Sequence, residues 1–171
     1  MIKKPILIKK KKYFDKRGFF QEIYLFKNLK IKMIFSAIAH SKKNVIRGLH
    51  FQIKKKQTKI IHVINGKILD VVVNLNRKSN NFGKVSRYVL NEGDILIVPN
   101  NFAHGYECLS KVCTVLYHLD NYRDIKSENG ISYNDKDLNI KWVTKKPIIS
   151  KRDRISETFA LFKKKLKRFK F

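Results

Sequence analysis

The chain has 171 residues, 43% of them hydrophobic, which fits one domain, 1–171, with a sizeable core. Its 39 Lys and Arg against 13 Asp and Glu give a net charge of +26, which favours anionic partners such as phosphorylated small molecules, nucleic acid or acidic membranes. The lysines are spread along the whole chain among many Ile and Asn residues, so a compositional bias is the simpler explanation. No apolar run approaches membrane length, so we expect a cytoplasmic protein that does not bind membranes.

Short strands separated by turn residues dominate about the first 120 residues. Apolar or alternating runs predict strands at 47–52, 60–64, 68–75, 85–90, 95–98 and 112–119. Asn65 and Gly66 separate the second and third runs, and Asn-Gly between two β-branched runs is a strong signal for a tight β-hairpin. Strands of this length and spacing predict an all-β protein, either a barrel or a double-sheet roll.

The end of the chain has a helical period instead. Within 156–171, Phe159, Phe162, Leu166 and Phe169 follow one another at spacings of three, four and three residues. This pattern predicts an amphipathic C-terminal helix with a basic outer face. Nothing before it indicates a linker, a repeat or a second domain.

The segment 47–52 carries the sharpest chemical signal, because it places His50 between Arg47 and Gln52 on a predicted strand. A histidine is a good proton acceptor near neutral pH, where its ordinary pKa of about 6.5 lies. A carboxylate on its second nitrogen would fix the tautomer, a tyrosine would serve as the opposing acid, and a lysine would hold a developing enolate oxygen. The structural alternative is a polar residue satisfied in a half-buried strand, and spacing alone does not pair His50 with a partner.

Metal binding is the first chemical alternative, since the chain has five histidines, His40, His50, His62, His104 and His118. A metal site in a β-roll usually presents two histidines two residues apart, but Gln52 follows His50 and Tyr106 follows His104 at that spacing. Cys108 and Cys113 have no zinc spacing and are expected to be buried thiols in a reducing compartment. We expect neither a metal nor another cofactor.

Eleven segments carry a family resemblance through their order and spacing over nearly the whole chain. They are 14–22, 41–52, 57–59, 66–75, 79–83, 98–106, 117–122, 128–131, 134–135, 140–142 and 149–153. Together they resemble the dTDP-4-dehydrorhamnose 3,5-epimerase family, cupin-type epimerases of nucleotide-linked 4-keto sugars. The resemblance implies an all-β, cupin-like double-sheet jelly roll with a short C-terminal helix. It also implies a homodimer that exchanges N-terminal strands.

The resemblance assigns roles that spacing leaves open. It implies that His50 is the base, that Asp153 orients it, that Tyr117 is the acid and that Lys59 lies near the keto oxygen. It places substrate contacts on six further residues, Arg17, Glu22, Arg47, His104, Glu128 and Arg152. Five of these residues have a structural alternative: Asp153 would cap the terminal helix, Tyr117 would be a core aromatic residue, His104 a turn residue, and Glu22 and Glu128 surface charges.

The implied reaction is epimerisation at C3 and/or C5 of a nucleotide-linked 4-keto-6-deoxy sugar, of the dTDP-4-dehydro-6-deoxyglucose to dTDP-4-dehydrorhamnose type. The product would feed cell-surface polysaccharide, and the only small-molecule partner implied is the nucleotide diphosphate-sugar. Two alternatives stay open: a mono-epimerase or ketoisomerase of another nucleotide sugar, and a basic nucleic-acid-binding module. No recognisable nucleic-acid motif supports the second.

Two departures from the family pattern affect the expected specificity. The segment 35–40 lacks the Gln-x-Asn of many relatives and carries Ala37 and Ala39, which leave room for a bulkier group. Arg123 stands where many relatives have the second of two adjacent tyrosines, and a guanidinium there could contact phosphate. Both departures leave the implied acid and base intact and concern the nucleotide and the sugar.

Overall fold

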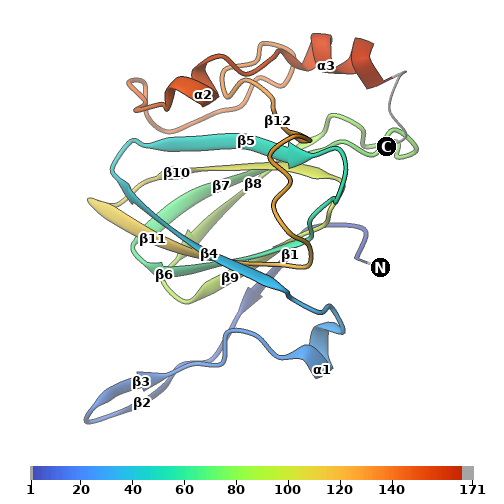
Figure 1. The fold of residues 1–171 in the computed structure, drawn as a ribbon. Helices are drawn as coiled ribbons and strands as arrows, with labels where there is room; N and C mark the ends of the chain where they lie inside the picture. Colours follow the sequence, from blue (N-terminus) through green and yellow to red (C-terminus); the bar gives the residue numbers. More distant parts are fainter. Residues whose placement is uncertain (1, 167–171) are drawn as a thin grey trace.

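Two antiparallel five-stranded sheets face each other in the computed structural model, which describes residues 2–166 (Figure 1). Sheet 1 has the order β1 (Ile6–Lys9), β9 (Asp94–Val98), β6 (Lys59–Asn65), β11 (Val112–Leu119), β4 (Phe35–Lys42). Sheet 2 has the order β12 (Glu128–Gly130), β5 (Ile46–Gln52), β10 (Phe102–Cys108), β7 (Lys67–Asn74), β8 (Val85–Asn91). A separate hairpin pairs β2 (Tyr13–Asp15) with β3 (Gly18–Phe20), and the helices are α1 (Phe26–Leu29), α2 (Lys151–Arg154) and α3 (Phe159–Lys165).

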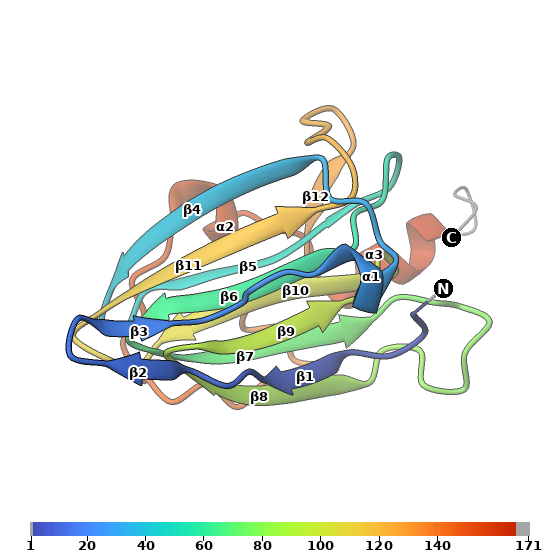
Figure 2. The same cartoon turned by 90° about the horizontal axis from the view of Figure 1, so that it is seen from below.

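Figure 2 shows the strands of the two sheets as two layers with a space between them. Inward-pointing side chains of both sheets fill this space. Ile61 and Val63 of β6 meet Ile68 and Val72 of β7 across this layer, together with Tyr106 of β10. All five are fully buried. Each buried aliphatic or aromatic side chain of this size contributes about 1.5 to 3 kcal/mol to folding, so this layer holds the sheets together.

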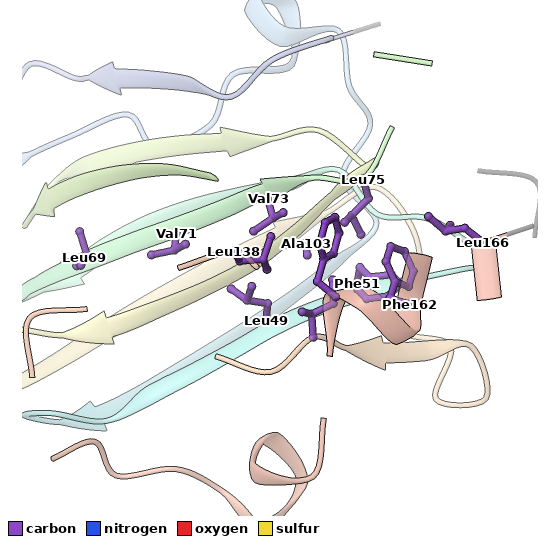
Figure 3. Packing of buried hydrophobic residues seen from close by; sticks show 12 residues of the cluster. Leu49, Phe51, Leu69, Val71, Val73, Leu75, Ala103, Leu138, Phe162 and Leu166 are labelled. Atoms are coloured by element: carbon purple, nitrogen blue, oxygen red, sulfur yellow. The ribbon is translucent and has the colours of Figure 1, made fainter. Parts of the chain in front are cut away.

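A second core covers the outer face of sheet 2 (Figure 3). Leu49 and Phe51 of β5 pack under the C-terminal segment, which contributes Leu138, Phe159 and Phe162. The rings of Phe51 and Phe162 meet edge to face with centroids 5.0 Å apart, which is a favourable geometry for a pair of aromatic rings. The C-terminal segment is therefore a third layer, and Figure 1 shows α2 and α3 lying over this sheet.

The six predicted strands are present, which confirms the double-sheet roll. The C-terminal helix is also present and begins later than predicted, since α3 spans Phe159–Lys165 with Thr158 as its N-cap. Its apolar stripe, Phe159, Phe162 and Leu166, is buried as expected, whereas Phe169 lies outside the described residues. None of the helices in this part of the chain is long and apolar enough to cross a membrane.

The predicted hairpin at Asn65 and Gly66 is wrong, because β6 and β7 belong to different sheets. Strand β6 is hydrogen-bonded to β11 and β9, and β7 to β10 and β8, so each strand already has two neighbours. The two residues form a corner between the sheets. Gly66 has φ +85°, and a Cβ there would lie 2.3 Å from the Val112 carbonyl oxygen, so the corner requires glycine.

We predict that Gly66→Ala destabilises the fold by about 3 kcal/mol, because it combines a left-handed backbone with a steric clash against backbone atoms. Urea unfolding measures the change. Gly18→Ala is the matched control: its φ is also positive, at +130°, but nothing lies within 4 Å of the added Cβ. Equal losses of stability in the two variants would contradict the role of the corner.

Candidate active site

A cavity of about 580 Å³ opens between the sheets on the side of β4, β5 and α2. A second cavity of about 150 Å³ shares five of its lining residues, His50, His104, Tyr117, Arg123 and Glu128. The smaller cavity also reaches Lys59 and the larger one Asp153. The four residues implied as catalytic therefore surround one connected region, although they come from β5, β6, β11 and α2.

His50 and Asp153 form a hydrogen-bonded pair across 103 residues of sequence. His50 Nε2 lies 2.6 Å from Asp153 Oδ1, and the backbone N–H of Gly48 donates to Oδ2 at 3.2 Å. Burial raises the pKa of Asp153, but hydrogen bonding and the charge of His50, with the Gly48 N–H, outweigh it and hold that pKa below the ordinary value. The ionised carboxylate places the imidazole proton on Nε2, which leaves the Nδ1 lone pair free to accept a proton.

The local sequence explains how the carboxylate reaches the histidine. Ser150 is the N-cap of α2 and accepts from the Asp153 N–H at 3.0 Å, so Asp153 lies in the first turn of that helix and is buried. Ser150 and Thr158 are thus the helix caps, and the alternative role of Asp153 as a cap is wrong. On the strand side, a Cβ on Gly48 would lie 2.5 Å from Gly105 Cα, so glycine is needed for the close approach of β5 and β10.

A second histidine–carboxylate pair lies beside the first. His104 is directly opposite His50 in the β10–β5 register, and its Nε2 lies 2.8 Å from Asp70 Oδ2. Burial lowers the pKa of His104, and the Asp70 carboxylate offsets part of this shift, so the ring is neutral at pH 7. His104 is in a strand and not in a turn. Sequence reasoning missed Asp70, although a lone acid inside the apolar run 68–75 was the available signal.

Tyr117 faces His50 from the other sheet. It is on β11, lines both cavities, and its ring meets that of His104 nearly at right angles, with centroids 6.1 Å apart. Burial, together with the negative charge of Asp70, raises its pKa well above 10, so the phenol keeps its proton at neutral pH. A neutral acid on one wall and a free imidazole nitrogen on the opposite wall can serve the two faces of a molecule between them.

Lys59 is a buried cation beside these groups. Its Nζ donates to the His50 carbonyl oxygen at 3.2 Å. Burial lowers the pKa of Lys59 to about 8, and the charges of Glu128 and Asp70 limit the shift. The ammonium is therefore still charged at pH 7, in surroundings where its field on a nearby oxygen is strong.

Three of the residues implied as substrate contacts line the larger cavity as charged groups. Arg47 is held by Ser41 Oγ, to which its Nε donates at 2.9 Å, and by the His40 carbonyl. Glu128 Oε1 lies 3.2 Å from Arg152 Nη2. Its other oxygen accepts from Arg123, which also lines the cavity.

Arg17 and Glu22 do not reach this cavity within one chain. Arg17 is in the turn of the β2–β3 hairpin and pairs with Asp15 at 2.6 Å, while Glu22 is exposed just after β3. Figure 1 shows this hairpin projecting away from both sheets. The structure therefore brings eight of the ten implied site residues together and leaves these two outside.

The metal alternative depends on whether histidine, cysteine and acidic side chains lie together. Between residues 2 and 166, no three His, Cys, Asp or Glu side chains lie close enough to hold a metal ion. Cys108 and Cys113 are free and buried, as expected. The acidic partners of His50 and His104 are each used in a single histidine pair.

The fold and the cavity define a cupin-like isomerase, and comparison with known proteins agrees. The family model described as dTDP-4-dehydrorhamnose 3,5-epimerase matches residues 1–160. The chain is 33% identical over 159 residues to the dTDP-4-dehydrorhamnose 3,5-epimerase of Methanothermobacter thermautotrophicus, covering 87% of this chain and 86% of that protein. This chain belongs to the dTDP-4-dehydrorhamnose 3,5-epimerase family.

Solved structures give the same answer. The Bacillus anthracis dTDP-4-dehydrorhamnose 3,5-epimerase with TDP and PPi bound superposes with a TM-score of 0.87 at 36% identity, covering 91% of this chain and 94% of that one. The Legionella pneumophila dTDP-6-deoxy-D-glucose-3,5-epimerase, in complex with dTDP-4-keto-L-rhamnose, has a TM-score of 0.89 at 29% identity, covering 95% and 91%. The cupin-like roll expected from the resemblance is confirmed.

We predict that Lys59→Met stabilises the protein at pH 7 by roughly 2 kcal/mol, because it removes a buried cation and costs one hydrogen bond. With a folded pKa of about 8 against 10.5, the unfolded chain binds more protons between these values, so wild-type stability rises over that range of pH. The loss of stability that the buried Lys59 ammonium causes is fully present below pH 8, and the variant does not have it. Urea unfolding at pH 7 and at pH 10 measures it, with exposed Lys54→Met as the control. A less stable Lys59→Met at pH 7 would contradict the assignment.

Proposed function

We propose that this chain epimerises C3 and C5 of dTDP-4-dehydro-6-deoxyglucose, giving dTDP-4-dehydrorhamnose, a precursor for cell-surface polysaccharide. The observation that carries the proposal is that His50 and Tyr117 lie on opposite sheets of the same cavity. Inversion of a carbon needs a base on one face and an acid on the other. The relatives named above, two of them with TDP or a dTDP-sugar bound, support the substrate class.

The proposed reaction begins at the carbon beside the 4-keto group, whose hydrogen is acidified by the carbonyl. Nδ1 of His50 takes this proton while Asp153 stabilises the imidazolium that forms. The electron pair moves onto the keto oxygen, and the Lys59 ammonium stabilises the resulting enolate. Tyr117 then returns a proton to the opposite face of the carbon, which inverts it. Each proton removed or returned exchanges with solvent before the next turnover.

A mono-epimerase of another nucleotide sugar is the second candidate, and the β4 wall supports the change of sugar. Ala39 lines the larger cavity and Phe35 the smaller one. This part of the wall therefore offers a sugar no side-chain amide, unlike the pattern expected for many relatives. A bulkier or less polar sugar would fit such a wall.

We predict that His50→Ala abolishes deuterium incorporation from heavy water into dTDP-4-dehydro-6-deoxyglucose, a loss of about a thousandfold or more for a missing general base. Asp153→Asn should slow incorporation without unfolding the protein, because only the orientation and charge of the imidazole change. NMR measures the rate and locates the deuterium, and label at one carbon instead of two would favour the mono-epimerase. Exchange at the wild-type rate in His50→Ala would refute the base assignment.

We also propose that the active unit is a homodimer in which the β2–β3 hairpin reaches the partner's cavity. A two-stranded hairpin is marginally stable by itself. This one exposes four aromatic side chains, Tyr13, Phe14, Phe19 and Phe20. Exposed apolar groups gathered on one element indicate a contact surface. Such an exchange would also bring Arg17 and Glu22 to a substrate, which a single chain does not achieve.

We predict that Phe20→Asp shifts the protein from dimer to monomer in sedimentation velocity, because it buries a charge in the proposed contact. Ile155→Asp, at a still more exposed apolar residue next to α2 (84% against 68% for Phe20), is the control and should change nothing. Measurements at about 50 mM and about 500 mM salt separate the repulsion between basic chains from the contact itself. A monomeric wild-type protein at both salt levels would rule the dimer out.

A further inference from the structure

Three guanidinium groups from three different elements line the larger cavity. Arg47 comes from β5, Arg152 from α2, and Arg123 from the segment that follows β11. The carboxylates on the same lining are Glu128 and Asp153, and Asp153 is committed to His50. Glu128 thus remains as the one carboxylate of this lining that faces the arginines.

Glu128 joins two of these arginines. Its Oε2 accepts from Arg123 Nε at 2.9 Å, and its Oε1 lies 3.2 Å from Arg152 Nη2. The Glu128 side chain is only 13% exposed, whereas those of Arg123 and Arg152 are 52% and 47% exposed. Burial raises the pKa of Glu128, but the two guanidinium groups outweigh it and keep that pKa below its ordinary value. The largely covered carboxylate of Glu128 therefore holds the two longer and more exposed arginine side chains.

The cluster of Glu128, Arg123 and Arg152 keeps unpaired N–H donors and a positive charge that a ligand could use. Arg123 uses its Nε for Glu128, and both of its Nη groups are without a partner in the described part of the chain. Two cations share one anion, so the cluster keeps a net charge of +1 at the cavity. Paired guanidinium groups with unused N–H donors match the geometry and charge of phosphate oxygens better than those of a neutral sugar.

We propose that Arg123 is a substrate-binding residue for the diphosphate, and that Glu128 is a positioning residue that holds Arg123 and Arg152 for it without contacting the substrate. The inference rests on the proposed function, which supplies the nucleotide diphosphate. The positioning role differs from the direct substrate contact that the family resemblance implies for Glu128. It also gives Arg123, a departure from the family pattern, a function of its own.

The first experiment measures the affinity for TDP by calorimetry, a probe that binds without reacting. Arg123→Gln should weaken TDP binding about tenfold or more and leave thymidine binding unchanged, since thymidine has no phosphate. Arg123→Lys should recover part of the loss, because it restores the charge without the forked donors. Arg154→Gln is the matched control, an exposed arginine of the same helix as Arg152 that does not line the cavity. Equal effects of Arg123→Gln and Arg154→Gln would overturn the inference.

The second experiment tests the positioning role with a double-mutant cycle on Glu128 and Arg123. Glu128→Gln makes the cavity more positive, so simple charge attraction predicts tighter TDP binding. Positioning predicts the opposite, a loss of about fivefold, and little further loss when Arg123→Gln is added. Tighter binding, or losses that add in the double variant, would overturn the positioning role.

A pyrophosphate titration separates this inference from the proposed function. Pyrophosphate binding that depends on Arg123, in a protein that does not prefer TDP, would keep the diphosphate site and remove the dTDP assignment. TDP binding that is indifferent to Arg123 would keep the proposed function and remove this inference. A wild-type protein that binds neither TDP nor pyrophosphate would remove both.

Discussion

The hydrogen bond between His50 and Asp153 is the contact on which the arrangement of the site depends. It joins a strand of sheet 2 to the segment that covers the outer face of the same sheet, so the third layer of the fold also completes the cavity. The apolar packing of Phe51 against Phe162 keeps this segment in place. The apolar packing of the outer core thereby holds the Asp153 carboxylate 2.6 Å from the His50 imidazole.

Burial shifts the pKa values of the other site residues so that each neutral form is favoured. It lowers the pKa of Lys59 and His104 and raises that of Tyr117, and in each case the neutral form gains. Nearby carboxylates limit the shifts of Lys59 and His104, so at pH 7 the lysine stays charged while the histidine and tyrosine are neutral. The high net charge of the chain is not the main cause of these pKa shifts, which is burial. The cations that matter are a few arginines and one buried lysine.

Local pattern predicted six of the twelve strands found in residues 2–166, missed β4 and β10 among the long ones, and predicted the pairing at Asn65 and Gly66 wrongly. Period-two alternation and β-branched runs depend on neighbours in sequence, so β8, β9 and β11 were predicted within one or two residues. The connection at Asn65 and Gly66 shows the limit, because the turn type alone does not decide which sheet receives the next strand. Strand β6 finds its partners in β9 and β11, which lie about 30 and 50 residues away in sequence.

By itself, the sequence determined an all-β domain, a histidine beside a glycine and an arginine, and, through its ordered motifs, the family. Those properties depend on residue type and spacing, which the chain carries at every point. Only the tertiary structure decided that Asp153 bonds His50, that Asp70 supports His104, and that Glu128 joins Arg123 to Arg152. Apart from Arg123 and Glu128, these pairs join residues 24 or more positions apart, so their contact depends on the packing of whole sheets and of the C-terminal layer.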